Sequence, residues 1–236
     1  MRSISIVIPA YNEEECIPTL FALIKEIVPG ITDDFEVIVV DDASEDTTPL
    51  VLDNAASLDP RIKVVHNKKN RKLGGTLREG FKKATKELVL YFDADQPFDL
   101  KEIRTALRLL EENADFVTAY RTNRNIDGPR RLLYSTLYNW LLNFLFHIKI
   151  KDVNFSFKLF KRDILENIKL DSEGSFISAE LLIKSTMAGF RIAQFPVTYL
   201  RRNKGRSTLS TPPVILKILQ ELSFFYLSFF IWYTHL

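Results

Sequence analysis

Residues 3–9 read SISIVIP, and this short run decides the fold. Its β-branched side chains, with Pro9 at the end, are typical of a buried strand. Comparable apolar runs recur at 36–41 (EVIVVD), 62–66 (IKVVH), 88–92 (LVLYF) and 115–119 (DFVTA). Helical patterns separate these runs, and strands that alternate with helices predict an α/β fold with a mostly parallel sheet flanked by helices.

Capping signals mark where the intervening helices begin. Asn12 and Glu15 have the spacing of a capping box, so a helix is expected to start at Asn12 and to bury its apolar stripe. Further helices are expected at 48–58, at 76–86 and from residue 99 onward. Because open α/β sheets bind ligands beyond the carboxyl ends of their strands, the functional site is expected at that edge.

Composition excludes several other classes of protein. The 236 residues fit one large α/β domain, or such a domain with a C-terminal appendage. The net charge of +2 gives no indication of a nucleic-acid partner, and none is expected. The single cysteine, Cys16, excludes an internal disulfide and suits a reducing compartment, and the first strand follows the N-terminus so closely that no signal peptide is expected.

Two of the apolar runs end in acidic residues, at Asp41-Asp42 and at Asp93-Ala94-Asp95. Both clusters should meet at the carboxyl edge of the sheet, where Asp93 and Asp95 face the same way if the chain stays extended. Two carboxylates beside a diphosphate are a typical Mg²⁺ site, although Asp also ends strands and caps turns in many proteins. Neither a G-x-G-x-x-G nor a P-loop motif occurs in the sequence, which argues against dinucleotide and P-loop enzymes.

Several motifs follow one another in an order that is typical of one enzyme family. They are 8–13 (IPAYNE), 40–44 (VDDAS), 74–80 (GGTLREG), 93–95 (DAD), 178–180 (SAE) and 196–207, in which Pro196-Val197 leads to Arg202, Gly205 and Ser207. Together they resemble family 2 glycosyltransferases, in the branch typified by dolichyl-phosphate mannose synthase. The resemblance covers about residues 3–208 and implies a GT-A (Rossmann-like) fold and an inverting sugar transfer that uses Mg²⁺ or Mn²⁺.

The resemblance also implies a role for individual residues. The nucleoside of the donor would be held by Pro9, Tyr11, Glu13, Val40 and Asp42. The donor diphosphate and the metal would be held by Asp93, Ala94, Asp95, Arg121 and Arg202, with Gln96 as a further metal ligand. The acceptor phosphate would be held by Arg131 and Ser135. The catalytic residues would therefore be Asp93, Asp95, Arg121 and Arg131.

Four positions depart from the family pattern. The family often has Gln two residues after the second Asp, whereas Gln96 follows Asp95 directly and Pro97 takes the expected place. Thr208 replaces a usual Lys, and Arg201 replaces a common Asp. The last departure is that the family's S-G-F-R segment reads Ser156-Phe157-Lys158 here, without its Gly.

The resemblance predicts a polyprenyl phosphate, of the dolichyl or undecaprenyl type, as the sugar acceptor. A phosphomonoester is largely dianionic at neutral pH and needs no general base, whereas an alcohol does. Two alternatives remain at this point. One is a family 2 transferase that acts on a saccharide, lipid or protein hydroxyl, with Asp152 or Glu180 as its base. The other is a nucleotide-sugar binding module without catalysis.

Apolar and aromatic residues crowd into 132–148 and 222–233. A membrane-spanning helix needs about 20 apolar residues, so the second run is too short alone, and both runs predict interfacial amphipathic helices, with core helices as the alternative. We therefore expect a transferase domain over 1–211, with the acceptor loop and an amphipathic helix at about 121–150, followed by a hydrophobic membrane-associating helix over 212–236.

These features together predict a peripheral enzyme on the cytoplasmic side of a membrane. The expected partners are a nucleotide-sugar donor (GDP-mannose or a UDP-hexose), a polyprenyl phosphate, the membrane surface and a small membrane-protein subunit.

Overall fold

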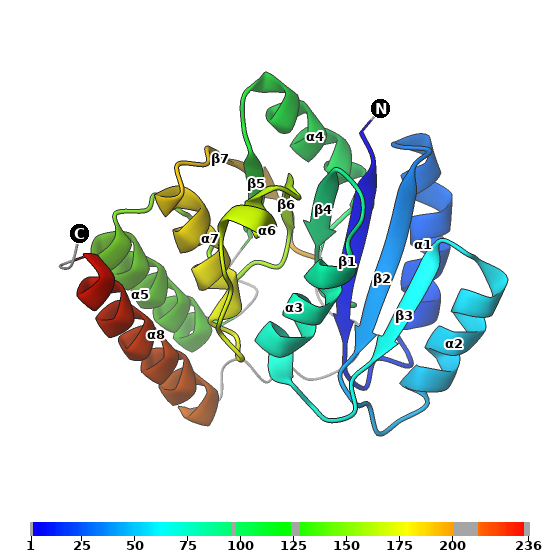
Figure 1. Cartoon of the computed structure of the whole chain (residues 1–236), viewed down its shortest axis with the longest axis horizontal. Helices are drawn as coiled ribbons and strands as arrows, with labels where there is room; N and C mark the ends of the chain where they lie inside the picture. Colours follow the sequence, from blue (N-terminus) through cyan, green and yellow to red (C-terminus); the bar gives the residue numbers. More distant parts are fainter. Residues whose placement is uncertain (1, 96–97, 124–127, 201–211, 234–236) are drawn as a thin grey trace.

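The computed structural model describes residues 2–95, 98–123, 128–200 and 212–233. A seven-stranded sheet forms its centre, with the strand order β3-β2-β1-β4-β6-β5-β7 (Figure 1). The strands are β1 (Ile4–Ala10), β2 (Phe35–Asp41), β3 (Ile62–His66), β4 (Leu88–Tyr91), β5 (Phe116–Arg121), β6 (Lys158–Lys161) and β7 (Ile192–Val197). The first four strands are parallel, and β6 is antiparallel to both of its neighbours. The expected α/β architecture with a mostly parallel sheet is confirmed.

Helices cover both faces of this sheet, as the continuous apolar strands require. The helices are α1 (Ile17–Ile27), α2 (Thr48–Leu58), α3 (Lys72–Lys83), α4 (Ile103–Glu112), α5 (Pro129–Phe146), α6 (Ile164–Asn167), α7 (Ile177–Met187) and α8 (Pro212–Tyr233), with short 3₁₀ turns η1 (Val28–Gly30) and η2 (Leu100–Glu102). In β1, Ile6 packs in the core layer of α1 and α4, whereas Val7 packs in the layer of α3, α5 and α7. This alternation buries the strand on both faces.

The first helix begins later than predicted. Helix α1 starts at Ile17, and Asn12 lies in the preceding loop with a left-handed φ of 55°. The Asn12 side chain accepts a hydrogen bond from the Glu45 amide at 2.8 Å, and its own amide donates to Ser44 Oγ at 3.0 Å. Asn12 therefore links the loop after β1 to the loop after β2. This long-range pairing competes with the local capping box, which explains why the helix does not start at Asn12.

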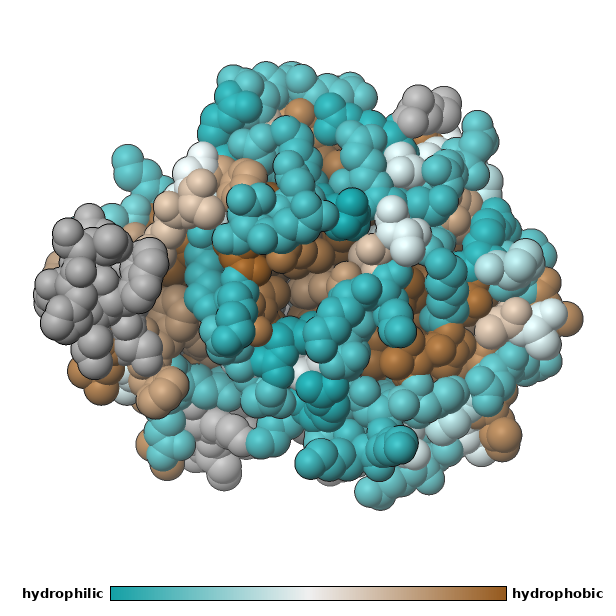
Figure 2. All heavy atoms as spheres, viewed as in Figure 1, coloured by the Kyte–Doolittle hydropathy of each residue, from teal (hydrophilic) through white to brown (hydrophobic). Residues whose placement is uncertain are grey.

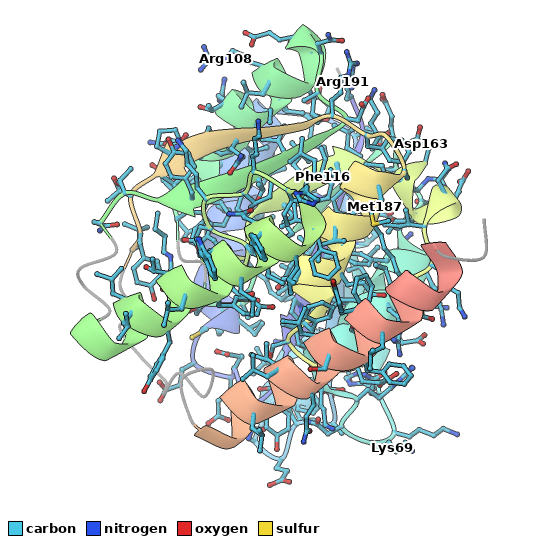
Figure 3. All side chains as sticks on the ribbon, turned by 90° about the vertical axis from the view of Figure 1, so that its left-hand side faces the viewer. Lys69, Arg108, Phe116, Asp163, Met187 and Arg191 are labelled. Atoms are coloured by element: carbon cyan, nitrogen blue, oxygen red, sulfur yellow. The ribbon has the colours of Figure 1, made fainter. Side chains whose placement is uncertain are left out.

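Helices α5 and α8 lie side by side at one end of the molecule (Figures 1 and 3). The ring of Phe146 on α5 contacts those of Phe225 and Tyr226 on α8, with centroids 5.6 and 5.9 Å apart. On the same helix, Leu222 is buried, and the Glu221 carboxylate accepts a hydrogen bond from the Gly174 amide at 3.0 Å. One face of α8 is thus part of the core, which the core alternative for this segment anticipates in part. Within the described ranges, each helix is too short or too polar to cross a membrane.

Candidate active site

The acidic loops meet at one edge of the sheet, as the parallel strand order requires. Strand β1 lies between β2 and β4, with Ala10 opposite Asp41 and Val7 opposite Tyr91. The segments that follow these strands therefore emerge next to one another. These segments and the last residues of β1 and β2 carry most of the residues expected to bind the donor: Pro9, Tyr11, Glu13, Val40, Asp42, Asp93, Ala94 and Asp95.

The loops after β1 and β2 turn sharply into the site. Both Asn12 and Ala43 adopt the left-handed conformation, with φ of 55° and 61°. The Glu13 amide donates to Thr48 Oγ1 at 2.9 Å, which joins the first loop to the start of α2. The loops that bear Glu13 and Asp42 are therefore held together before any ligand binds.

Asp42 is buried, and its orientation is fixed from one side. Its Oδ1 atom accepts hydrogen bonds from Asn67 Nδ2 at 2.8 Å and from the Arg71 amide at 2.7 Å. A carboxylate held in this way presents its second oxygen as an acceptor for the N–H groups of a base or for a ribose hydroxyl. Asn67 is missing from the sequence-based site, and its only signal there is its place directly after the run 62–66.

The neighbouring Asp41 turns toward β3 instead. Its Oδ2 lies 2.9 Å from His66 Nδ1, and His66 Nε2 lies 3.0 Å from Asp53 Oδ1. The hydrogen bond with Asp41 is the main cause that raises the pKa of His66, burial opposes it, and Asp53 adds to the rise. Asp41 and His66 therefore hold the end of β2 against β3.

The expected metal half of the site centres on Asp93. The Tyr91 hydroxyl donates to Asp93 Oδ1 at 3.2 Å, and Ser178 is a second hydrogen-bond partner of the same hydroxyl. Burial raises the pKa of Tyr91 well above its usual value, so the phenol stays protonated and remains a donor. In the described part of the chain, three or more His, Cys, Asp or Glu side chains nowhere gather as a metal site. Two carboxylates alone fit Mg²⁺ or Mn²⁺ when a substrate diphosphate completes the coordination.

Arg121, at the end of β5, is buried in a bidentate ion pair. Its Nε donates to Asp152 Oδ2 at 2.7 Å and its Nη2 to Asp152 Oδ1 at 3.2 Å. The guanidinium also lies near the rings of Phe155 and Tyr199, at 5.9 and 5.6 Å from their centroids. Since both Asp152 oxygens are paired with Arg121, Asp152 orients this arginine and is poorly suited to act as a general base.

The second base candidate, Glu180, is also fully engaged. Its side chain is 0% exposed and accepts hydrogen bonds from the amides of Asp171 and Ser172 at 2.9 and 2.8 Å. Lys184 Nζ adds a third contact, at 2.6 Å from the same carboxylate. Glu180 thus holds the 171–172 turn against α7, which is a structural role.

The acceptor side is described only in part. Arg131 belongs to the first turns of α5, but the position of its side chain lies outside the described residues. Ser135, on the same helix, donates its hydroxyl to the Leu132 carbonyl at 3.0 Å. Gln96 and Arg202 also lie outside the described residues, so their predicted roles stay predictions.

Exposed apolar side chains run along the outer sides of α5 and α8. In Figure 2 a few hydrophobic residues, interspersed with hydrophilic ones, lie at the lower-left margin of the molecule. Trp140 and Phe144 stack at 5.5 Å between ring centroids. We call this surface the apolar face, and its described members are Leu133, Leu137, Trp140 and Phe144 on α5, and Leu216, Leu219, Phe224 and Leu227 on α8.

Comparison with known proteins identifies the enzyme family to which the chain belongs. Residues 5–169 match the family model described as Glycosyl transferase family 2. Glycosyltransferase AglD of Haloferax volcanii is 33% identical over 204 residues, which are 83% of this chain, and the chain spans only 33% of that protein's length. Polyprenol monophosphomannose synthase of Mycolicibacterium smegmatis is 29% identical over 87% of this chain and 80% of its own length. Undecaprenyl-phosphate mannosyltransferase of Micrococcus luteus is 28% identical over 89% of this chain and 88% of its own length.

Solved structures support the fold. Glucosyl-3-phosphoglycerate synthase from Mycobacterium tuberculosis is 22% identical with a TM-score of 0.68, over 94% of this chain and 79% of that chain. The same enzyme in complex with Mn²⁺, UDP-glucose and phosphoglyceric acid has a TM-score of 0.71 at 20% identity, over 92% of this chain and 77% of that chain. At this level of identity, the likeness is one of architecture, and the expected GT-A-type fold is confirmed.

Proposed function

The chain belongs to glycosyl transferase family 2, and from this premise we propose that it moves a sugar from a nucleotide diphosphate onto a polyprenyl phosphate, with inversion and with a divalent metal. One observation carries the choice of acceptor. The two carboxylates that a hydroxyl acceptor would need as a base, Asp152 and Glu180, are held in fixed structural pairs. A phosphate acceptor needs no base, and two relatives are named for transfer to polyprenol phosphates.

The donor side follows from the loops at the carboxyl edge. Asp42 would accept from the base or ribose, with Pro9, Tyr11, Glu13 and Val40 around the nucleoside. The carboxylates of Asp93 and Asp95 would hold Mg²⁺ or Mn²⁺, which stabilises the leaving diphosphate when it is bound. The order of the strands supports this division into a nucleoside half and a metal half, because Asp42 follows β2 and Asp93 follows β4, on opposite sides of β1.

The rest of the proposed catalysis consists of neutralising the donor diphosphate and positioning the acceptor phosphate. Arg121, oriented by Asp152, would add a positive charge beside the diphosphate. Arg131 would grip the acceptor phosphate with its planar fork and direct an oxygen toward the anomeric carbon. Ser135 is placed on the same helix, one turn further on, where it would line the same path.

The apolar face supports a peripheral position on a membrane. A lipid acceptor must be reached at the bilayer surface, and exposed Trp, Phe and Leu on helices that lie in that surface bind it through buried apolar area. Because α5 carries both Arg131 and part of the apolar face, the acceptor phosphate and the membrane would lie on neighbouring sides of one helix. The cytoplasmic side and a small membrane-protein subunit on this face remain parts of the proposal.

A panel of donors and acceptors tests this function. Radiolabelled GDP-mannose, UDP-glucose and UDP-N-acetylglucosamine are each offered with a short polyprenyl phosphate, with the matching polyprenol and with no acceptor. We expect one donor to give metal-dependent transfer to the phosphate only. Transfer to the polyprenol, or to a saccharide or protein hydroxyl, would instead support the hydroxyl alternative. Nucleotide-sugar binding without turnover on any acceptor would point to a binding module.

A further inference from the structure

A fully buried lysine lies directly behind the metal half of the site. Lys158 is in β6, paired in register with Tyr91 of β4 and with Thr118 of β5, and it is 0% exposed. Lysine is almost never buried to this extent unless its charge is compensated. Its presence in the middle of the sheet therefore calls for an explanation.

The ammonium group is held by fixed contacts. Lys158 Nζ donates to the carbonyls of Val153 and Phe155, at 3.1 and 2.6 Å, and lies 5.7 Å from the centroid of the Tyr91 ring. Burial lowers the pKa of Lys158 to about 8, while the charges of Asp93 and Asp152 act to raise it. The two carbonyl acceptors and the charges of Asp93 and Asp152 favour the ammonium form of Lys158.

These contacts join parts of the site that are far apart in the sequence. Tyr91, over which the ammonium lies, donates its hydroxyl to Asp93. Val153 and Phe155, whose carbonyls accept hydrogen bonds from the ammonium, lie in the loop that follows Asp152. Asp152 is in turn the partner of Arg121. One cation thus lies between the proposed metal carboxylate and the loop that orients the proposed phosphate arginine.

We propose that Lys158 is a positioning residue that holds the 153–155 loop and offsets the negative charge of Asp93 from inside the protein, so that the metal binds well only together with the donor diphosphate. This rests on the proposed metal role of Asp93 and Asp95. Without a donor, a fixed internal cation weakens the attraction of the two carboxylates for a divalent ion. The anionic diphosphate restores that attraction when it arrives with the metal.

The test measures metal binding without turnover. The full chain is titrated with Mn²⁺, and free Mn²⁺ is followed by electron paramagnetic resonance, with and without GDP or UDP. Lys158→Gln removes the charge but keeps an N–H donor for the loop carbonyls, and Lys158→Met removes both. Lys158→Arg keeps the charge. The control is Lys161→Met on the same strand, because Lys161 pairs with Asp115 at 2.7 Å, away from the site.

We expect Lys158→Gln to bind Mn²⁺ alone at least ~threefold more tightly than the parent, because a nearby positive charge is lost while a donor to the loop remains. Lys158→Met also releases the loop, so it should gain less than Lys158→Gln. Lys158→Arg and Lys161→Met should match the parent. A purely structural lysine predicts the opposite sign, since a loosened site binds metal less well. Unchanged or weaker Mn²⁺ binding in the folded Gln variant would overturn the inference. A parent chain that binds no Mn²⁺, with or without nucleotide, would instead overturn the proposed metal site itself.

Discussion

Replacing Asp152 with Asn tests the buried pair on which the proposed site depends. The pair is bidentate, and the side chains of Arg121 and Asp152 are only 8% and 2% exposed. Removing one partner of a buried ion pair costs about 3–5 kcal/mol, and Asn retains one acceptor oxygen, so we expect a loss of about 3 kcal/mol. For a chain of 236 residues, each kcal/mol lowers Tm by roughly 2–4 °C, which predicts a drop of about 6–12 °C.

The assay combines thermal unfolding, followed by near-UV circular dichroism, with donor kinetics at a fixed salt concentration. Glu166→Gln is the matched control, because it breaks the exposed pair between Glu166 on α6 and Arg162, which precedes that helix. Such surface pairs contribute about 0–1 kcal/mol, so Tm should hardly move. In the Asp152 variant we also expect a lower kcat, since Arg121 loses the partner that would aim it at the donor phosphates under the proposed function.

Two outcomes would refute this reasoning. If Tm of Asp152→Asn stays within about 2 °C of the parent, the Arg121–Asp152 pair contributes little to the free energy of unfolding, despite its burial. If Tm and donor affinity are unchanged but turnover is abolished at every pH, Asp152 is a general base, and a hydroxyl acceptor becomes the better proposal.

Four further results are expected. Asp95→Ala should lower the rate at least ~100-fold while Tm is kept, and EDTA should do the same to the parent, which metal-dependent transfer assays check. Arg131→Lys should raise the acceptor KM by on the order of tenfold and leave donor binding unchanged, which separate titrations of the two substrates measure. Phe224→Glu should abolish sedimentation with liposomes while transfer to a short soluble acceptor persists, and equal loss of both would contradict the membrane role of the apolar face. The pKa of His66 is raised in the folded protein, so its contribution to stability is present below its unfolded pKa of about 6.5 and is lost as pH rises through the folded pKa. The free energies of unfolding of the parent and of His66→Gln, measured between about pH 6 and 8, should show this loss in the parent only.

The meeting of the acidic loops at one edge of the sheet could be predicted from the sequence because its signals are local. Strands β1 to β5 are short runs of apolar residues, and parallel strands bring their carboxyl ends to one edge whatever the loops contain. The acidic clusters at Asp42 and Asp93 could therefore be placed together without coordinates. The predicted start of α1 was wrong because Asn12 forms hydrogen bonds with a loop more than thirty residues away rather than with its own helix.

The remaining features depend on contacts between distant residues. Strand β6 reads KLFK, and a run of four residues with lysine at both ends gives no clear sign of a central strand. The burial of Lys158 and the pairing of Arg121 with Asp152 follow from the insertion of this strand, so they could not be anticipated from spacing. Asn67 shows the same limit, since only the fold brings its amide to Asp42.

The insertion of β6 also has a consequence for how the protein folds. Among the described strands, β1 to β4 lie on one side of β6, whereas β5 and β7 lie on the other side and join the sheet through β6. During synthesis, one edge of β4 therefore stays unpaired until the much later residues 158–161 leave the ribosome. We expect β5, β6 and β7 to exchange their amide hydrogens as one cooperative unit, separate from the strands of the nucleoside half. A chaperone that protects an open sheet edge would act in this interval.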